Sequence, residues 1–187
     1  MAALIFPMTM MGQYTIYPVP HTQTAGTGTV SFTNIVNVVC DNGIDEATRN
    51  RVKDIFAAHN VTVTFSDAAS STESNVYLGV NGANGQGNAM ATQLGLSTDV
   101  LTKEGKFDRH ILSLTDGGNG TAQLLVLGEN TDATFFGLAS LEQMLDNGTE
   151  GLATVTINDY ADLKERGVIE GFYGKPYAGE VRQDLLR

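Results

Sequence analysis

Short runs of β-branched and aliphatic residues follow one another along this chain, and most are bounded by glycine, asparagine or aspartate. Valine, isoleucine and threonine favour strands because their branched side chains pack well on a pleated surface. The runs that we expect to form strands are TVSFT (29–33), IVNVVC (35–40), VTVTFS (61–66), NVYLGV (75–80), RHILSLT (109–115) and AQLLVLGEN (122–130). The segment LATVTINDYADLKERG (152–167) adds another strand and a polar connector. Such a chain must fold around a sheet.

Two segments have the apolar periodicity of a good helix. The first covers about 45–59 with Asp45 as its N-cap, and the second follows residue 130, with Thr131 or Asp132 as its cap and Gly148 as its stop. Gly137 costs the second helix about 1 kcal/mol relative to alanine, so we expect close packing on a sheet there. The apolar positions are Ile44, Val52, Ile55 and Phe56, then Leu138, Leu141, Met144 and Leu145. Because helices are few, we predict an α/β (α+β) fold, a mixed sheet with helices packed mainly on one face.

Three weaker segments complete this prediction. YTIYPVPHTQTAG (14–26) reads as an edge strand, because Pro18 and Pro20 cannot donate to a ladder. GVNGANGQG (79–87) lacks the Gly-Lys-Ser/Thr of a phosphate loop, and Met90 stands where a dinucleotide fingerprint needs its third glycine. We therefore interpret it as a flexible loop, followed by a weak helix over about 89–95.

Composition restricts the class of protein. A chain of 187 residues with 42% hydrophobic and 17% charged residues is long enough for one globular domain with a core. Its net charge of −10 repels phosphate backbones, so no nucleic-acid partner is expected. The single cysteine, Cys40, ends an apolar run and is interpreted as a buried small hydrophobe. Residues 1–13 are apolar but too short to span a membrane, and they read as a leader remnant or an expression-derived segment.

Motifs for metal or nucleophile chemistry are not found in residues 1–157. The three histidines, His21, His59 and His110, are scattered without a zinc-binding spacing, and there is no G-x-S-x-G. Asp159 and Asp162 lie in a polar connector and are expected to form a solvated surface. We expect no catalytic residue, no metal site and no cofactor in this chain.

The tail RGVIEGFYGKPY (166–177) is different. It resembles the signature that opens the catalytic barrel of family-84 glycoside hydrolases, Arg-Gly-x-x-Glu-Gly-Phe/Tyr-Tyr-Gly-x-Pro-Trp, with Tyr177 as the one departure. These enzymes are bacterial β-N-acetylglucosaminidases, often named hyaluronidases, and relatives of the animal O-GlcNAc hydrolase. Upstream blocks such as YTIYPVPH and LLVLGENTDATFFGLASLEQML are similar to the small domain that precedes that barrel, which is also found in family-20 hexosaminidases. The resemblance covers about residues 14–187.

The resemblance implies a domain organisation. Residues 14–160 would form the N-terminal hexosaminidase-like α/β domain, and residues 161–187 would be a connector and the first strand of a (β/α)8 barrel that is otherwise missing. In the family an acetamido oxygen of the substrate attacks the anomeric carbon, while two adjacent aspartates on a later barrel strand orient it and exchange the proton. The chain contains no Asp-Asp pair. We therefore expect this chain to be inactive alone.

Few site residues transfer from the resemblance. The family's sugar pocket is lined by the glycine after the motif glutamate and by the tyrosine two places on, which match Gly171 and Tyr173 here. These would bind substrate in an intact parent enzyme. Arg166, Glu170 and Gly174 match the same motif and are expected to support the strand and its turn.

Three hypotheses for function follow. The first is a non-catalytic accessory domain of a secreted or cell-surface bacterial β-N-acetylglucosaminidase, which meets N-acetylglucosamine-containing glycans through its own barrel and does not contact membranes. The second is a free-standing carbohydrate-binding or adhesion module, although the chain has no tryptophan and only 7% aromatic residues. The third is an interaction domain of unknown ligand. Separated from barrel neighbours, the strand in the tail would expose unpaired backbone groups, so we expect it to fray or to mediate self-association.

Overall fold

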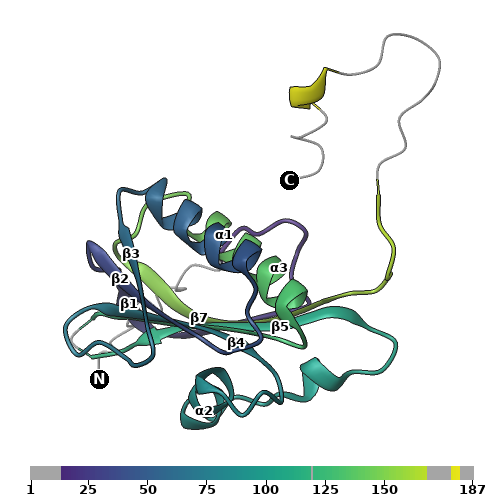
Figure 1. The fold of residues 1–187 in the computed structure, drawn as a ribbon, viewed down its shortest axis with the longest axis horizontal. Helices are drawn as coiled ribbons and strands as arrows, with labels where there is room; N and C mark the ends of the chain where they lie inside the picture. Colours follow the sequence, from purple (N-terminus) through teal and green to yellow (C-terminus); the bar gives the residue numbers. More distant parts are fainter. Residues whose placement is uncertain (1–13, 119, 168–177, 182–187) are drawn as a thin grey trace, which may run out of the picture.

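A seven-stranded mixed sheet forms the centre of the molecule, with the strand order β1-β7-β5-β6-β4-β2-β3. The computed structural model describes residues 14–118, 120–167 and 178–181 (Figure 1). The strands are β1 (Thr22–Val30), β2 (Ile35–Cys40), β3 (Thr62–Ser66), β4 (Ser74–Val80), β5 (Phe107–Asp116), β6 (Ala122–Gly128) and β7 (Leu152–Ala161). The helices are α1 (Glu46–Ala57), α2 (Gln86–Gln93), α3 (Thr131–Met144) and the 3-10 turn η1 (Asp99–Thr102).

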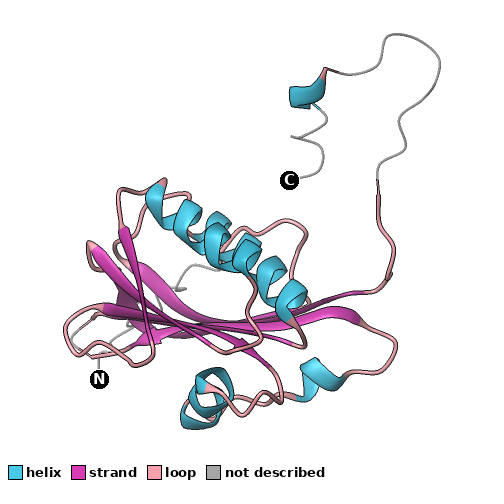
Figure 2. Ribbon diagram, viewed as in Figure 1, coloured by secondary structure: helices cyan, strands magenta, loops and turns pink. Residues whose placement is uncertain are grey.

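The sheet is parallel on one side and antiparallel on the other. Strands β3, β2, β4 and β6 run parallel, whereas β5, β7 and β1 join antiparallel. Parallel neighbours need a crossover, and α1 supplies the one between β2 and β3. The long helices α1 and α3 cover one face, and the shorter α2 lies on the other (Figure 2). The predicted fold class is confirmed.

The core is divided by the sheet into two layers. Under α1 and α3 lies the larger cluster, which includes Phe56, Leu138 and Leu141, all fully buried. A smaller cluster on the opposite face packs Met90 of α2 and Leu101 of η1 against Leu125 and Leu127. Both layers are therefore covered by helix.

The two long helices begin with side-chain caps. The prediction for α1 is confirmed, because the Thr48 N–H donates to Asp45 Oδ1 at 2.8 Å. The prediction for α3 is wrong by one residue, since Asn130 has the extended backbone of a cap and accepts from the Ala133 N–H at 2.8 Å. The hydroxyl of Thr131 instead accepts from the Asp45 N–H at 3.1 Å, which joins the starts of α1 and α3.

The loop expected over residues 79–87 is confined to residues 81–85, because Gly79 and Gly87 belong to a strand and a helix that pack closely together. Gly79 belongs to β4 and Gly87 to α2, and a Cβ on either would come within 3 Å of the other's Cα. The Asp41 carboxylate lies beside both glycines and accepts from the Gly87 N–H at 3.3 Å. The expected weak helix is α2, which begins three residues earlier than predicted because Gly85 is its N-cap.

The first strand is an edge strand, as predicted, but its limits differ. It begins at Thr22, after both prolines, and it continues to Val30. The expected separate strand at 29–33 is therefore wrong, because Thr29 and Val30 end β1 and Ser31 forms only an isolated bridge with Thr121. A register shift between Ala25 and Thr29 marks the change in the ladder with β7. Proline cannot donate to a ladder, which explains why pairing starts beyond Pro20.

Candidate functional site

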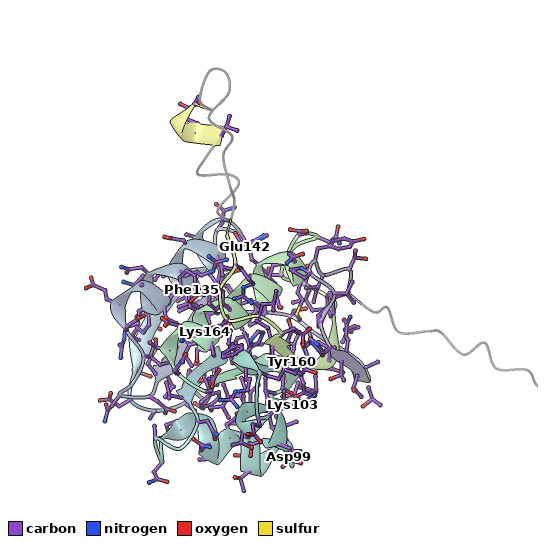
Figure 3. All side chains as sticks on the ribbon, turned by 90° about the vertical axis from the view of Figure 1, so that its right-hand side faces the viewer. Asp99, Lys103, Phe135, Glu142, Tyr160 and Lys164 are labelled. Atoms are coloured by element: carbon purple, nitrogen blue, oxygen red, sulfur yellow. The ribbon has the colours of Figure 1, made fainter. Side chains whose placement is uncertain are left out.

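A groove of about 710 Å³ lies at the end of β7, between α3 and the segment that precedes β1. Side chains from residues 16–21, from α1, α3 and β5, and from the connector after β7 line it. A second hollow of about 540 Å³ lies beside it on the η1 side and shares His21 and Tyr160. In Figure 3, Glu142, Phe135, Lys164, Tyr160, Lys103 and Asp99 mark this side of the molecule, from which the connector leaves.

The segment before β1 forms one wall of the groove, and side-chain hydrogen bonds with α3 and β7 hold it in place. The side-chain amide of Gln143 is bound twice to Tyr17: its oxygen accepts from the Tyr17 N–H at 2.8 Å, and its nitrogen donates to the Tyr17 carbonyl at 2.9 Å. The Tyr14 hydroxyl donates to the Ala153 carbonyl at 2.8 Å. Burial of this hydroxyl raises the pKa of Tyr14 to about 12, so it remains a donor. The segment thus has a fixed position over α3.

His21 lies between two carboxylates at the boundary of the two hollows. Its ring stacks on Tyr160 with centroids 3.6 Å apart and an interplanar angle of 26°. Its Nδ1 lies 2.9 Å from Asp159 Oδ1, and its Nε2 lies 3.7 Å from Asp162 Oδ2. The Asp159 side chain is only 21% exposed, so the expectation of a solvated surface is wrong at that residue, whereas Asp162 is 62% exposed and fits it.

The ammonium groups of two lysines lie over the ring of Tyr160. The Lys103 ammonium donates to the Tyr160 hydroxyl at 2.7 Å and lies 4.4 Å from the ring centroid. Lys106 lies 5.3 Å from the same centroid and donates to Asp162 at 2.6 Å. That hydrogen bond lowers the pKa of Asp162 and raises the pKa of Lys106. Tyr160 therefore contacts cations and an imidazole, which leaves its ring less available as a sugar platform.

A carboxylate and a guanidinium fix the end of β5 that borders the site. Arg109 is paired with Glu129, and both side chains are less than one-fifth exposed. Burial alone would raise the pKa of Glu129, but the hydrogen bonds from Arg109 outweigh it and lower that pKa. Arg109 also donates to the Lys103 carbonyl at 2.6 Å, so the pair holds the η1 turn in place.

The connector after β7 borders the groove, and its Arg166 is held there by two contacts. Arg166, the first residue of the tail motif, pairs with Asp108, and its guanidinium lies 5.6 Å from the Phe136 ring centroid. The strand and turn that Arg166 is expected to support lie outside the described residues, so this role stays a prediction. The predicted substrate-binding residues Gly171 and Tyr173 lie outside the described residues, as do Glu170 and Gly174.

Two buried nitrogens point to unused hydrogen-bonding capacity in the groove wall. His110 is 5% exposed, and its Nδ1 lies 2.8 Å from the Asp108 carbonyl, which assigns the proton to Nδ1. Burial lowers the pKa of His110, so the ring is neutral and Nε2 is an acceptor. Within residues 14–118, 120–167 and 178–181, His110 Nε2 and Arg51 Nε are the buried side-chain polar atoms without a partner. Both residues line the groove.

Exposed apolar side chains gather at the same place. Tyr17 is 70% exposed, Val19 is 74% exposed and Phe136 is 43% exposed, and all three line the groove. Leu163, 68% exposed, follows on the connector. Sequence reasoning missed this surface, although Phe135 and Phe136 are adjacent on a helix and cannot both face the core.

In the part of the chain that the structure describes, the charged side chains of the groove are paired with one another. Nothing in the described part of the chain forms a group of three or more metal-ligating side chains. Cys40 is only partly buried, whereas the sequence predicted a buried side chain. Burial is the main cause that raises the pKa of Cys40 to about 11, which keeps its thiol protonated at neutral pH. The described helices include none with the length and apolar character needed to cross a membrane.

Comparisons with known proteins agree with this geometry. The sequence profile of the family described as "Glycosyl hydrolase family 20, domain 2" matches residues 13–160. The solved structure of CpGH84D is 31% identical, with a TM-score of 0.79 over 93% of this chain and 28% of that one. The structure of CpGH84B is 24% identical, with a TM-score of 0.71 over 93% of this chain and 27% of that one, and shows the same fold. The chain therefore spans little more than a quarter of these proteins.

Proposed function

This chain belongs to the glycosyl hydrolase family 20, domain 2 family, and we propose that it is the non-catalytic N-terminal accessory domain of a bacterial β-N-acetylglucosaminidase. The parent would be a hyaluronidase-like or O-GlcNAc hydrolase-like enzyme, secreted or held at the cell surface. Hydrolysis by its barrel would use the acetamido group of the substrate and retain the configuration at the anomeric carbon. The domain would support that barrel and leave the chemistry to it.

One observation carries the proposal. The barrel-opening motif RGVIEGFYGKPY begins at Arg166, only five residues after β7 ends at Ala161, yet no Asp-Asp pair occurs in the chain. The likeness to the much longer CpGH84D supports a parent in which this domain precedes further chain.

The coding sequence downstream of Arg187 provides the test. We expect it to encode a barrel with an Asp-Asp pair after a strand, and the protein made from it should hydrolyse 4-nitrophenyl N-acetyl-β-D-glucosaminide. Replacing either aspartate of that pair with asparagine should abolish turnover, because the pair orients the acetamido group and exchanges the proton. A downstream sequence without such a barrel, or a long protein without this activity, would overturn the proposed function.

A further inference from the structure

Five Asn-Gly pairs occur in this sequence, and their glycines differ in hydrogen bonding. The pairs are Asn42-Gly43, Asn81-Gly82, Asn84-Gly85, Asn119-Gly120 and Asn147-Gly148. In such a pair the backbone nitrogen of the glycine can attack the side-chain carbonyl of the asparagine, because glycine has no side chain to obstruct the approach. We propose that Asn84 is a site of spontaneous covalent modification, at which the side-chain amide is lost through a cyclic imide.

The reaction needs no reagent besides water. A bond forms between the Gly85 nitrogen and Cγ of Asn84, the nitrogen loses its proton, and the Cγ–Nδ2 bond breaks with release of ammonia. Water then opens the five-membered imide at one of its two carbonyls. The product is either aspartate or isoaspartate, in which the backbone runs through the former side chain. The glycine N–H must therefore be free to react, and the asparagine must be free to rotate.

Three of the five glycine N–H groups are held by hydrogen bonds. Their acceptors are Asn88 Oδ1 for Gly82 and Asp116 Oδ1 for Gly120, both at 3.0 Å, and the Leu145 carbonyl for Gly148, at 2.7 Å. Asn81 is tied as well, since its Oδ1 accepts from Asn88 Nδ2 at 2.9 Å. Because such a bond must break before the nitrogen attacks, these three pairs should react slowly.

Asn42-Gly43 lies in a closed turn. The Ile44 N–H donates to the Asp41 carbonyl at 3.0 Å, and this bond fixes the two residues between them. A Cβ on Gly43 would lie 3.2 Å from Cγ2 of Val80, so the turn also packs against β4. The Gly43 N–H has no acceptor within the described residues, but rotation of this turn would disturb the start of α1.

Asn84-Gly85 combines a free N–H with an open surrounding. Within residues 14–118, 120–167 and 178–181, neither the Gly85 N–H nor the Asn84 side chain has a hydrogen-bond partner. Asn84 is exposed, and its φ of 51° lies in the left-handed region, which residues with a Cβ adopt infrequently. Rotation of Asn84 breaks no hydrogen bond, so this pair is the one most free to close the imide.

The position of Gly85 gives the reaction a structural consequence. Gly85 is the N-cap of α2, and its carbonyl accepts from the Ala89 N–H at 3.2 Å (Figure 1). A Cβ on Gly85 would overlap the buried carboxylate of Asp41, so the backbone there has no spare room. Isoaspartate adds one carbon atom to the backbone before Gly85. It should therefore loosen the start of α2, whereas an ordinary aspartate should leave the helix in place.

Incubation of native and urea-unfolded samples of the 187-residue chain at mildly alkaline pH tests the site. Tandem mass spectrometry follows each asparagine, and electron-transfer fragmentation separates aspartate from isoaspartate. In the native chain Asn84 should react fastest, about tenfold ahead of Asn81 and Asn147, since one hydrogen bond can slow the attack by about that factor. In urea all five pairs should react at similar rates. Similar rates in the native chain, or a faster reaction at another pair, would contradict the proposal.

Matched variants separate the added backbone atom from the added charge. Asn84→Gly tolerates the left-handed backbone and has no amide to lose, so the incubated variant should form no isoaspartate at residue 84. Freshly prepared Asn84→Asp carries the charge alone. Hydrogen exchange of the α2 amides should become faster in incubated wild type and stay slow in both variants, while α3 should not change in any sample. Unchanged exchange of α2 in wild type that has formed isoaspartate would contradict the structural consequence. Conversion to aspartate without isoaspartate would overturn the route through the imide.

Discussion

At the scale of single residues, His110 combines burial with a neutral ring. Its Nδ1–H is used by the Asp108 carbonyl, and the ring packs against the Gly137 position of α3. The sequence showed His110 only as an isolated histidine in an apolar run, without a metal-binding spacing. Its burial comes from the pairing of β5 with β7 and from the cover of α3, neither of which a local pattern reveals.

The lowered pKa of His110 predicts a pH dependence of stability. An unfolded histidine has a pKa near 6.5, so below that pH the unfolded chain binds a proton that the folded chain excludes. Stability should therefore be complete above about pH 6.5 and fall as the pH drops toward the folded pKa, with a slope of at most about 1.4 kcal/mol per pH unit from this group. Urea unfolding of wild type and His110→Asn between about pH 7 and pH 5 measures it.

The asparagine variant keeps a donor for the Asp108 carbonyl but does not titrate. Its free energy of unfolding should consequently vary less across this range than that of wild type. Parallel pH profiles for the two proteins would show that His110 is not the group responsible.

Gly137 supports a second prediction, which is tested by the direction of the change in melting temperature. A Cβ at this position would lie 2.6 Å from Val126 Cγ1 and 3.1 Å from His110 Cδ2, both on buried side chains. Gly137→Ala should gain about 1 kcal/mol of helix propensity and lose about 1–3 kcal/mol to overpacking. We expect a lower melting temperature. A higher one would mean that α3 can move away from the sheet at little cost.

At the scale of elements, the regular part of the fold was predictable and the irregular part was not. Apolar spacing identified α1 and α3, because Val52, Leu138 and Leu141 face the sheet at helical intervals. The cap of α3 was missed, since Asn130, Thr131 and Asp132 are all good caps and only the backbone of Asn130 is extended. The η1 turn has no periodicity of its own, so its position was not predictable.

The buried face of α3 supports a prediction of large effect. Leu141 is fully buried in the larger core, so Leu141→Ala should lower the free energy of unfolding by about 2–5 kcal/mol. Glu142 is the matched control on the same helix, because its side chain is 58% exposed and pairs with Arg51 at the surface. Glu142→Ala should cost about 1 kcal/mol or less. Chemical denaturation that ranked the two variants equally would contradict the assignment of the core face.

At the scale of the whole molecule, the family could be predicted from the tail motif and the sequence blocks before it. The groove could be found only from the structure. Tyr17, Phe136 and Arg166 are far apart in sequence. They line one groove because Gln143 of α3 binds the segment before β1, β7 pairs with β5, and α3 packs on β5. Long-range contacts of this kind leave no local signal. Gly171 and Tyr173 remain predictions from the motif alone.

We propose that this chain folds around its own core and performs no hydrolysis. The most direct measurement is the release of 4-nitrophenol from 4-nitrophenyl N-acetyl-β-D-glucosaminide by the folded, repurified 187-residue chain. We predict a rate equal to that of buffer, because the chain has no Asp-Asp pair to orient the acetamido group and transfer the proton. Turnover that persists through repurification and disappears in Tyr173→Phe would contradict this proposal.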